Sequence, residues 1–103
     1  MAHRVVYSPE AQHDLFQLYG YIAEHSGLER ARAYTARIEA HCRGFADLPE
    51  RGTLRNDLRP GLRITGFERR VVIAFHVSAE TVTIDRILYG GREFKTPLGE
   101  DDI

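Results

Sequence analysis

The sequence has 103 residues, of which 43% are hydrophobic and 28% charged, and its formal net charge is −1. This length and balance fit a single folded domain and exclude a disordered chain. No apolar run approaches the roughly 20 residues that span a bilayer, so the composition predicts no membrane helix. The sequence pI of 6.5 also argues against general affinity for nucleic acid.

Apolar periodicity predicts a short strand followed by two helices. Residues Arg4–Tyr7 form the expected strand, and Ser8-Pro9-Glu10 has the capping serine, first-turn proline and acidic residue of a helix start. Ser26-Gly27 closes this helix, and a second helix follows at once and is expected to run to Pro49. Two amphipathic helices joined by so few residues form an antiparallel hairpin. The apolar positions of the second helix are Ala31, Tyr34, Ile38, Cys42, Phe45 and Leu48.

From residue 62 the apolar period becomes two, which predicts strands. Leu62–Thr65 is a short strand, Gly66-Phe67-Glu68 offers a turn, and alternating runs cover 71–77 and 81–89. Three strands with tight links form an antiparallel meander. The expected fold is therefore α+β with the order β-α-α-β-β-β, a helical hairpin packed on a small antiparallel sheet. We expect one domain over residues 1–95 and an acidic tail over 96–103.

Few residues have the spacing that metal binding or nucleophilic catalysis needs. The five histidines are scattered, and none is paired at helical spacing with another histidine or with Cys42, so no metal and no cofactor are expected. Cys42 lies on the apolar stripe of the second helix and is expected to be a small buried hydrophobe. A single cysteine and an N-terminus without a signal-peptide pattern predict a cytoplasmic protein.

Arginine supplies 13 of the 14 basic residues, and six of them lie between residues 51 and 70. Such a stretch fits an anionic partner surface or, equally, a solvated loop. A polar set is also expected on the strands: Arg63, Arg70, His76, Arg86 and Tyr89, with Arg92 just beyond. These residue types can stabilise a scissile phosphate and move protons in an RNA-cleaving site. In the alternative, Arg86 pairs with Asp85 or Glu68, His76 is half-buried, and Tyr89 packs in the core. Strict strand alternation also sets Arg86 and Tyr89 on opposite faces.

Several motifs in order resemble the RelE/ParE superfamily of bacterial toxins, and the ParE-type toxins in particular. They are Tyr7-Ser8-Pro9-Glu10-Ala11, Leu48-Pro49-Glu50-Arg51-Gly52, Val72-Ile73-Ala74-Phe75 and the run from Ile84 to Glu93. The resemblance extends from about residue 4 to residue 94, and it implies the same β-α-α-β-β-β fold. It also implies the toxin component of a type II toxin–antitoxin system.

The resemblance leaves two activities open. ParE-like members are associated with inhibition of DNA gyrase, and RelE-like members cut messenger RNA on the ribosome. Phe94 lacks a hydroxyl and the strands lack lysine, so the chain fits the ParE branch better, as a non-enzymatic inhibitor that binds gyrase. The expected gyrase contacts are Arg63, Arg86, Tyr89, Arg92 and Phe94. The endoribonuclease alternative would use Arg63, His76, Arg86 and Arg92, and a third alternative is a member that only binds antitoxin and represses a promoter.

The resemblance also implies a protein partner, a ParD-like antitoxin that forms a hetero-oligomer with the toxin and connects it indirectly to DNA. The aromatic residues Tyr19, Tyr21, Tyr34 and Phe67 are the candidate antitoxin contacts. The alternative is that the helix tyrosines pack in the core, since aromatic residues at helical spacing usually face inward.

Overall fold

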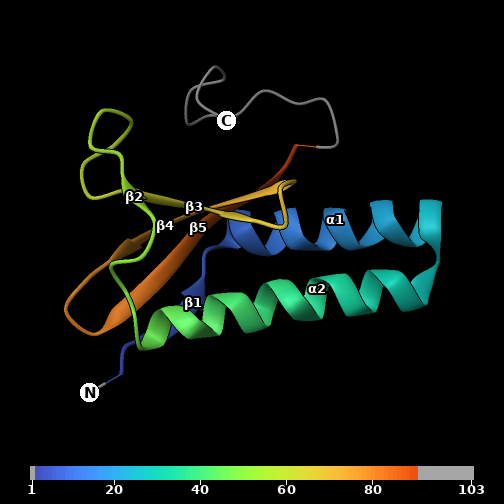
Figure 1. Ribbon diagram of the computed structural model, residues 1–103, viewed down its shortest axis with the longest axis horizontal. Coiled ribbons are helices and arrows are strands. Elements are labelled where there is room, and N and C mark those ends of the chain that lie inside the picture. The colour runs from blue at the N-terminus through green and yellow to red at the C-terminus, as the bar shows by residue number, and fades with distance from the viewer. Residues whose placement is uncertain (1, 91–103) are drawn as a thin grey trace.

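The computed structural model describes residues 2–90 of the chain, which begin with a strand and a capped helix (Figure 1). Strand β1 covers Arg4–Tyr7 and helix α1 covers Pro9–Ser26. The Ser8 side chain accepts a hydrogen bond from the Ala11 amide at 3.0 Å, which satisfies one of the free amides of the first turn. The same hydroxyl donates to the carbonyl oxygen of Asp85 at 3.0 Å, so the helix cap is also tied to the sheet.

Helix α2 covers Leu28–Arg43 and is joined to α1 through Gly27, whose φ is 99°. The helix is shorter than the periodicity predicts. It ends at Arg43, a 3-10 turn covers Gly44–Ala46, and Leu48 is exposed. Glycine is a poor helix former, and the turn at Gly44 directs Phe45 into the core, where its ring stacks on Phe75 at 4.4 Å. Within residues 2–90, no helix combines the length and apolar character that a bilayer crossing requires.

The sheet has five strands in the order β1-β5-β4-β3-β2. Strands β3 (Arg63–Phe67), β4 (Val71–Val77) and β5 (Thr81–Tyr89) form the expected antiparallel meander. Strand β1 pairs with β5 in parallel, so the sheet is mixed, and a two-residue strand β2 (Thr53–Leu54) pairs with β3. Strand β3 runs through the expected turn to Phe67, and the chain reverses at Glu68 and Arg69, which both have positive φ. The α+β class and the helical hairpin on a sheet are confirmed.

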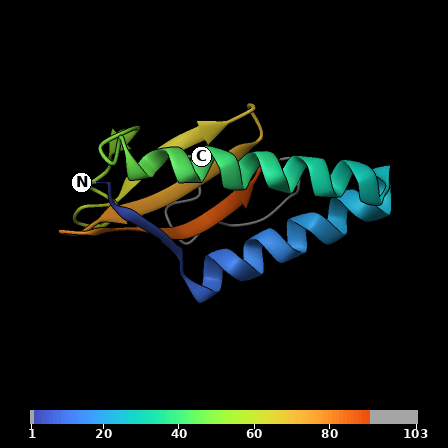
Figure 2. The ribbon, with the colours of Figure 1, turned by 90° about the horizontal axis from the view of Figure 1, so that it is seen from below.

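Both helices cover the same face of the sheet and run on past its end toward the turn that joins them (Figures 1 and 2). The main core lies between helices and sheet and includes Leu18, Ile38, Phe45, Phe75 and Ile84. A second, smaller cluster lies on the other face. There the buried residues Leu62, Ala74 and Leu88 pack against Leu58, Ile64 and Val72.

A bulge in β5 changes which side chains share a face. Ala74 pairs with Arg86 whereas the next residue, Phe75, pairs with Ile84, so Asp85 is the extra residue. Ile84 and Ile87, three residues apart, therefore both pack in the helix-side core. The strict alternation expected from the sequence was wrong beyond Ile84, because one inserted residue reverses the side-chain parity of the rest of the strand.

Two glycines of the segment before β3 have positive φ, and only one of them is crowded. Gly52 has φ of 75°, and a Cβ there would overlap the carbonyl oxygen of Ile64 in β3; Gly61 has φ of 78° with open space around it. We expect Gly61→Ala to lower the free energy of unfolding by about 1 kcal/mol, from the left-handed conformation alone. We expect Gly52→Ala to lower it by about 2 to 3 kcal/mol, since the β2–β3 pair must also shift. Urea unfolding of both variants measures the difference, and equal losses would contradict the close approach.

Candidate interaction surface

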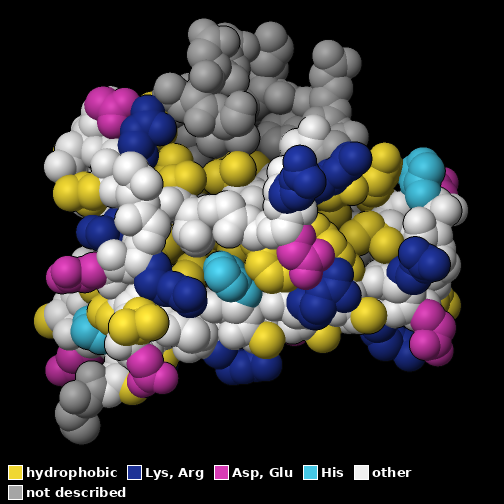
Figure 3. All heavy atoms as spheres, in the orientation of Figure 1, with side chains coloured by type: hydrophobic (Ala, Val, Ile, Leu, Met, Phe, Trp, Pro, Cys, Tyr) yellow, Lys and Arg dark blue, Asp and Glu magenta, His cyan; other side chains and the backbone are white. Residues whose placement is uncertain are grey.

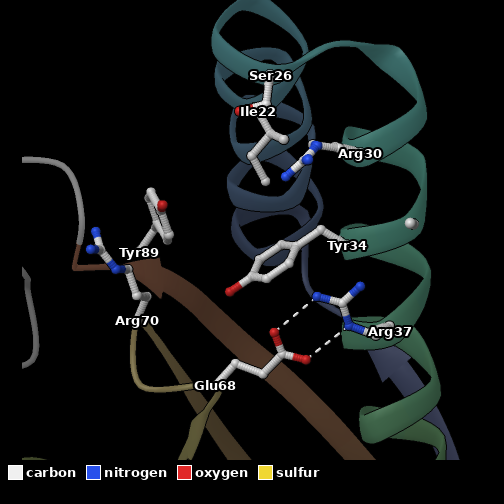
Figure 4. A pocket seen from close by; sticks show the side chains of 9 residues that line it. Ile22, Ser26, Arg30, Tyr34, Arg37, Glu68, Arg70 and Tyr89 are labelled. Atoms are coloured by element: carbon white, nitrogen blue, oxygen red, sulfur yellow. Dashed lines mark hydrogen bonds and ion pairs between the residues drawn. The ribbon is translucent and has the colours of Figure 1, made fainter.

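A pocket opens where the overhanging helices face the end of the sheet. Its volume is about 380 Å³, and its lining includes Ile22, Arg30, Tyr34, Arg37, Arg70 and Tyr89. Figure 4 shows that α2 contributes Arg30, Tyr34 and Arg37, while Arg70, in the turn before β4, and Tyr89, at the end of β5, stand opposite them. On the face seen in Figure 3, basic side chains stand beside exposed apolar ones in this region. The arrangement combines an apolar lining with a basic rim.

The charges around this pocket are only partly paired. Arg37 donates from Nε and Nη2 to the two carboxylate oxygens of Glu68 at 2.8 and 2.9 Å, and its guanidinium lies 5.0 Å from the centre of the Tyr34 ring. Among residues 2–90, neither Arg30 nor Arg70 forms an ion pair with another side chain. Burial raises the pKa of the Tyr34 hydroxyl, with a further contribution from Glu68, so Tyr34 is a neutral donor at physiological pH.

The structure brings three of the four predicted antitoxin contacts to this end of the molecule. The rings of Tyr34 and Phe67 pack edge to face with their centres 5.9 Å apart. The ring centre of Tyr21 lies 5.7 Å from that of Tyr89, a predicted gyrase contact. Three of these aromatic residues are half-buried and pack against the main core: Tyr34, Phe67 and Tyr89. Each therefore has one part in the core, as the packing alternative expects, and one part exposed for a partner. Tyr19 is half-buried on α1 but does not line the pocket.

Arg86 is held by α1 rather than by the acids that the sequence suggested. Its Nε and Nη2 donate to the Asp14 carboxylate at 2.7 and 2.9 Å, and the Ile87 amide donates to the same carboxylate at 2.9 Å. The hydrogen bonds that Arg86 donates to Asp14 raise the pKa of Arg86. Strand β1 pairs with β5 only as far as Ile84, so Asp14 satisfies an amide on the edge of β5 that β1 leaves open. The expected pairing of Arg86 with Asp85 or Glu68 was therefore wrong.

His76 and Arg63 lie on opposite faces of the sheet. Cross-strand partners share a face, so Arg63, which pairs with Phe75, lies on the helix side, and His76 lies on the other side. Arg63 donates to the backbone carbonyls of Arg51 and Glu50 at 2.9 and 2.8 Å. The sheet register therefore separates these two residues of the nuclease set.

Asp85, the bulge residue, contacts both His76 and Arg59 on the face of the sheet away from the helices. Its Oδ2 lies 2.7 Å from His76 Nδ1 and 3.1 Å from Arg59, and only 14% of its side chain is exposed. Arg59 belongs to the loop before β3, so this cluster fastens the loop to the sheet. The predicted contacts Arg92 and Phe94 lie outside the described residues.

Cys42 is buried, as expected, beneath Tyr7 of β1. Burial raises the pKa of its thiol to about 11 and is also the main cause of a raised pKa at Tyr7. Because the folded thiol keeps its proton where the unfolded one loses it, stability is intact below the ordinary thiol pKa of 9.0 and falls as pH rises from there to about 11.

We expect the free energy of unfolding to fall by about 1 to 2 kcal/mol more in the natural chain than in Cys42→Ala between pH 8 and pH 10.5. Urea titrations of both chains at the two pH values measure this difference. Cys42→Ala is the matched control because it removes the thiol titration and keeps the tyrosines. A parallel decline in the two chains would contradict the assignment.

Three residues of this region were not predicted from the sequence. Arg30 lines the pocket, Glu68 binds Arg37, and Asp14 binds Arg86. Asp14 offered one signal, an acid next to the apolar stripe of α1, although its partner is 72 residues away. Arg30 lies off the apolar stripe of α2, and no sequence signal places it in a pocket, because the pocket depends on how far the hairpin extends beyond the sheet.

The chain is similar to known proteins in both fold and sequence. It resembles a solved structure described as "Chromosomal ParDE TA system from P. aeruginosa", with a TM-score of 0.75 and 22% identity, covering 85% of this chain and 96% of the other. Residues 5–94 match the family described as the ParE toxin of the type II toxin–antitoxin system parDE, and the chain belongs to that family. A curated relative is Toxin ParE3 of Caulobacter vibrioides, 32% identical over 97 residues, which cover 94% of this chain and 96% of the relative.

Proposed function

We propose that this chain inhibits DNA gyrase by direct binding, in the cytoplasm, and that a ParD-like antitoxin neutralises it in a hetero-oligomer. The observation that carries the proposal is membership of the ParE toxin family over residues 5–94. A solved relative of the same fold is described as a ParDE toxin–antitoxin system, which supports an antitoxin as the partner. DNA contact would come only through that antitoxin.

The positions of the polar strand residues weigh against the endoribonuclease alternative. A nuclease needs its basic and proton-transferring groups within reach of one phosphate. Here Arg63 and His76 occupy opposite faces of the sheet, and Arg86 is engaged by Asp14. Bringing the three together would require breaking the register of β3 and β4, so we favour a protein that acts by binding.

Of the proposed gyrase contacts within residues 2–90, Tyr89 is the one that lines the open pocket. Arg63 and Arg86 already donate to groups of the chain itself, so gyrase would have to share or replace those bonds. Tyr89 lines the open pocket, and Arg92 and Phe94 follow it in sequence. We therefore place the inhibitory contact at the C-terminal end of β5 and the residues that follow.

For the antitoxin we propose the aromatic surface of Tyr21, Tyr34 and Phe67, together with Tyr19 on α1. Flexible peptides bind grooves of this kind by inserting apolar anchors, and the basic rim would attract an acidic segment. The aromatic pairs at 5.9 and 5.7 Å hold the rings in fixed positions, which lowers the entropic cost of binding.

Expression of the chain without an antitoxin separates the three activities. The expected result is growth arrest with loss of negative supercoiling in a reporter plasmid and unchanged messenger RNA 5′ ends. The same gene with an early stop codon is the control. Codon-phased cuts in messenger RNA with normal plasmid topology would favour the endoribonuclease instead, and unimpaired growth would favour a member that only binds antitoxin.

A further inference from the structure

His41, near the C-terminal end of α2, has its ring in contact with two phenylalanine rings. Its ring centre lies 5.5 Å from that of Phe45, in the 3-10 turn, and 5.1 Å from that of Phe67, at the end of β3. Phe67 in turn packs edge to face on Tyr34. The histidine ring therefore connects the Tyr34–Phe67 pair to the main core, of which Phe45 is a buried member.

The Nε2 atom of His41 is buried and has no hydrogen-bond partner among residues 2–90. Neutral imidazole has one N–H and one bare nitrogen, whereas the protonated ring has an N–H on both nitrogens and a positive charge. Protonation of His41 in place would therefore bury a charged donor against apolar rings without an acceptor. That state is unfavourable, because the donor and the charge lose their hydration and nothing replaces it.

The charges near His41 also favour its neutral form. Burial lowers the pKa of the His41 ring below its ordinary value of 6.5, and the positive charge of Arg51 lowers it further. Arg63, the one charged residue of β3, is also a cation and donates to backbone carbonyls of residues 50 and 51. The 3-10 turn, Gly44–Ala46, carries no charge.

The acid beside Phe67 is already bound by another residue. Glu68, in the turn after β3, accepts two hydrogen bonds from Arg37, which lies one helical turn before His41 on α2. Its carboxylate is therefore neutralised by Arg37 rather than by the histidine. The ring of His41 thus has aromatic neighbours on two elements, and the charge that acts on it is that of Arg51.

We propose that His41 is an acid-sensitive contact between α2 and the end of β3. The neutral ring holds Phe67 against the helix, and the protonated ring leaves the two phenylalanines and releases it. The chain reverses directly after Phe67, at Glu68 and Arg69, so the β3–β4 turn would be released with it. The proposal concerns the isolated chain and does not depend on gyrase or on an antitoxin.

The pH range of this effect follows from the sign of the pKa change. The folded ring binds a proton less readily than the unfolded ring, whose pKa is 6.5. The contribution of His41 to stability is therefore complete above pH 6.5 and declines as the pH falls from 6.5 toward the lowered pKa of the folded ring. Within that range, His41 can raise the unfolding equilibrium constant by up to about tenfold per pH unit.

An NMR titration of the full chain from about pH 7.5 to about pH 5 tests the proposal. The ring signals of His41 report its protonation, and nuclear Overhauser contacts between His41 and Phe67 report their packing. We expect these contacts at the upper pH and their loss with the same midpoint as the protonation of His41. Contacts that persist after His41 has been protonated would overturn the proposal. The titration needs no variant, so it decides the question even if a substitution at His41 prevents folding.

His41→Phe is the matched variant, since it keeps a ring beside Phe45 and Phe67 but cannot bind a proton. Urea unfolding of both chains at pH 6.5 and pH 5.5 should show a larger rise of the unfolding equilibrium constant in the natural chain, by a factor of up to about ten. His13→Gln removes an exposed histidine of α1 and should behave as the natural chain does. Equal pH dependence in the natural chain and His41→Phe would overturn the proposal, and so would its loss in His13→Gln.

Discussion

The Phe75→Ala variant is expected to lose about 4 kcal/mol of unfolding free energy, the largest effect of any single change considered for this chain. Phe75 in β4 is fully buried, and its ring stacks on Phe45 at 4.4 Å with an angle of 20° between the planes. This contact joins the sheet to the segment that follows α2. Alanine would leave a cavity that neither element can close without moving. Urea unfolding followed by circular dichroism measures the loss.

Phe16→Ala is the matched control for that prediction. Phe16 lies on α1 with 76% of its surface exposed, so its removal should change the free energy of unfolding by less than about 0.5 kcal/mol. Phe75→Leu provides a graded variant, with an expected loss of about 1.5 kcal/mol, in case the alanine variant does not fold. Similar losses for Phe16→Ala and Phe75→Ala would contradict the assigned core.

The Asp14→Ala variant is expected to lose about 3 kcal/mol, because it leaves a partly buried arginine and a strand amide without their acceptor. Asp14 accepts three hydrogen bonds from Arg86 and Ile87, with only 12% of its side chain exposed. The change should also expose the edge of β5 beyond Ile84. Hydrogen exchange at the Ile87 amide reports that opening directly.

Two further variants separate the parts of this interaction. Asp14→Asn keeps an acceptor oxygen for Ile87 while removing the charge, so it should lose less stability than Asp14→Ala. Glu68→Ala removes the exposed partner of Arg37 and should have a much smaller effect, since water already screens that pair. An equal loss of unfolding free energy in Glu68→Ala and Asp14→Ala would contradict the view that burial strengthens the pair of Asp14 and Arg86.

Local chemistry made much of the fold predictable. Ser8, Pro9 and Glu10 mark the start of α1, and the change from helical to strand periodicity after residue 62 locates the meander. The parallel pairing of β1 with β5 could not be predicted in the same way, because it joins residues nearly 80 positions apart and leaves no local pattern. The bulge at Asp85 likewise depends on the register of two strands, and it changed which residues of β5 share a face.

The interaction surface was predictable in its aromatic residues and less so in its charges. Tyr34 and Phe67 could be picked out by residue type. Tyr34 lines the pocket, and Phe67 packs against Tyr34. Arg63, Arg86 and His76 also stood out by type, but each bonds to a group that sequence spacing does not reveal. Within residues 2–90, an arginine without an ion pair can be recognised only after the other arginines have been given their partners, as Arg30 and Arg70 show.

Gyrase inhibition by the purified chain is the most direct test of the proposed function. Purified DNA gyrase is assayed for supercoiling of relaxed plasmid in the presence of ATP and increasing amounts of the chain. The natural chain, denatured by heat before the assay, serves as the control for folded structure at equal concentration. We expect supercoiling to decline with the concentration of the folded chain and to persist with the denatured chain. Full supercoiling activity at saturating concentrations of the natural chain would contradict the proposal.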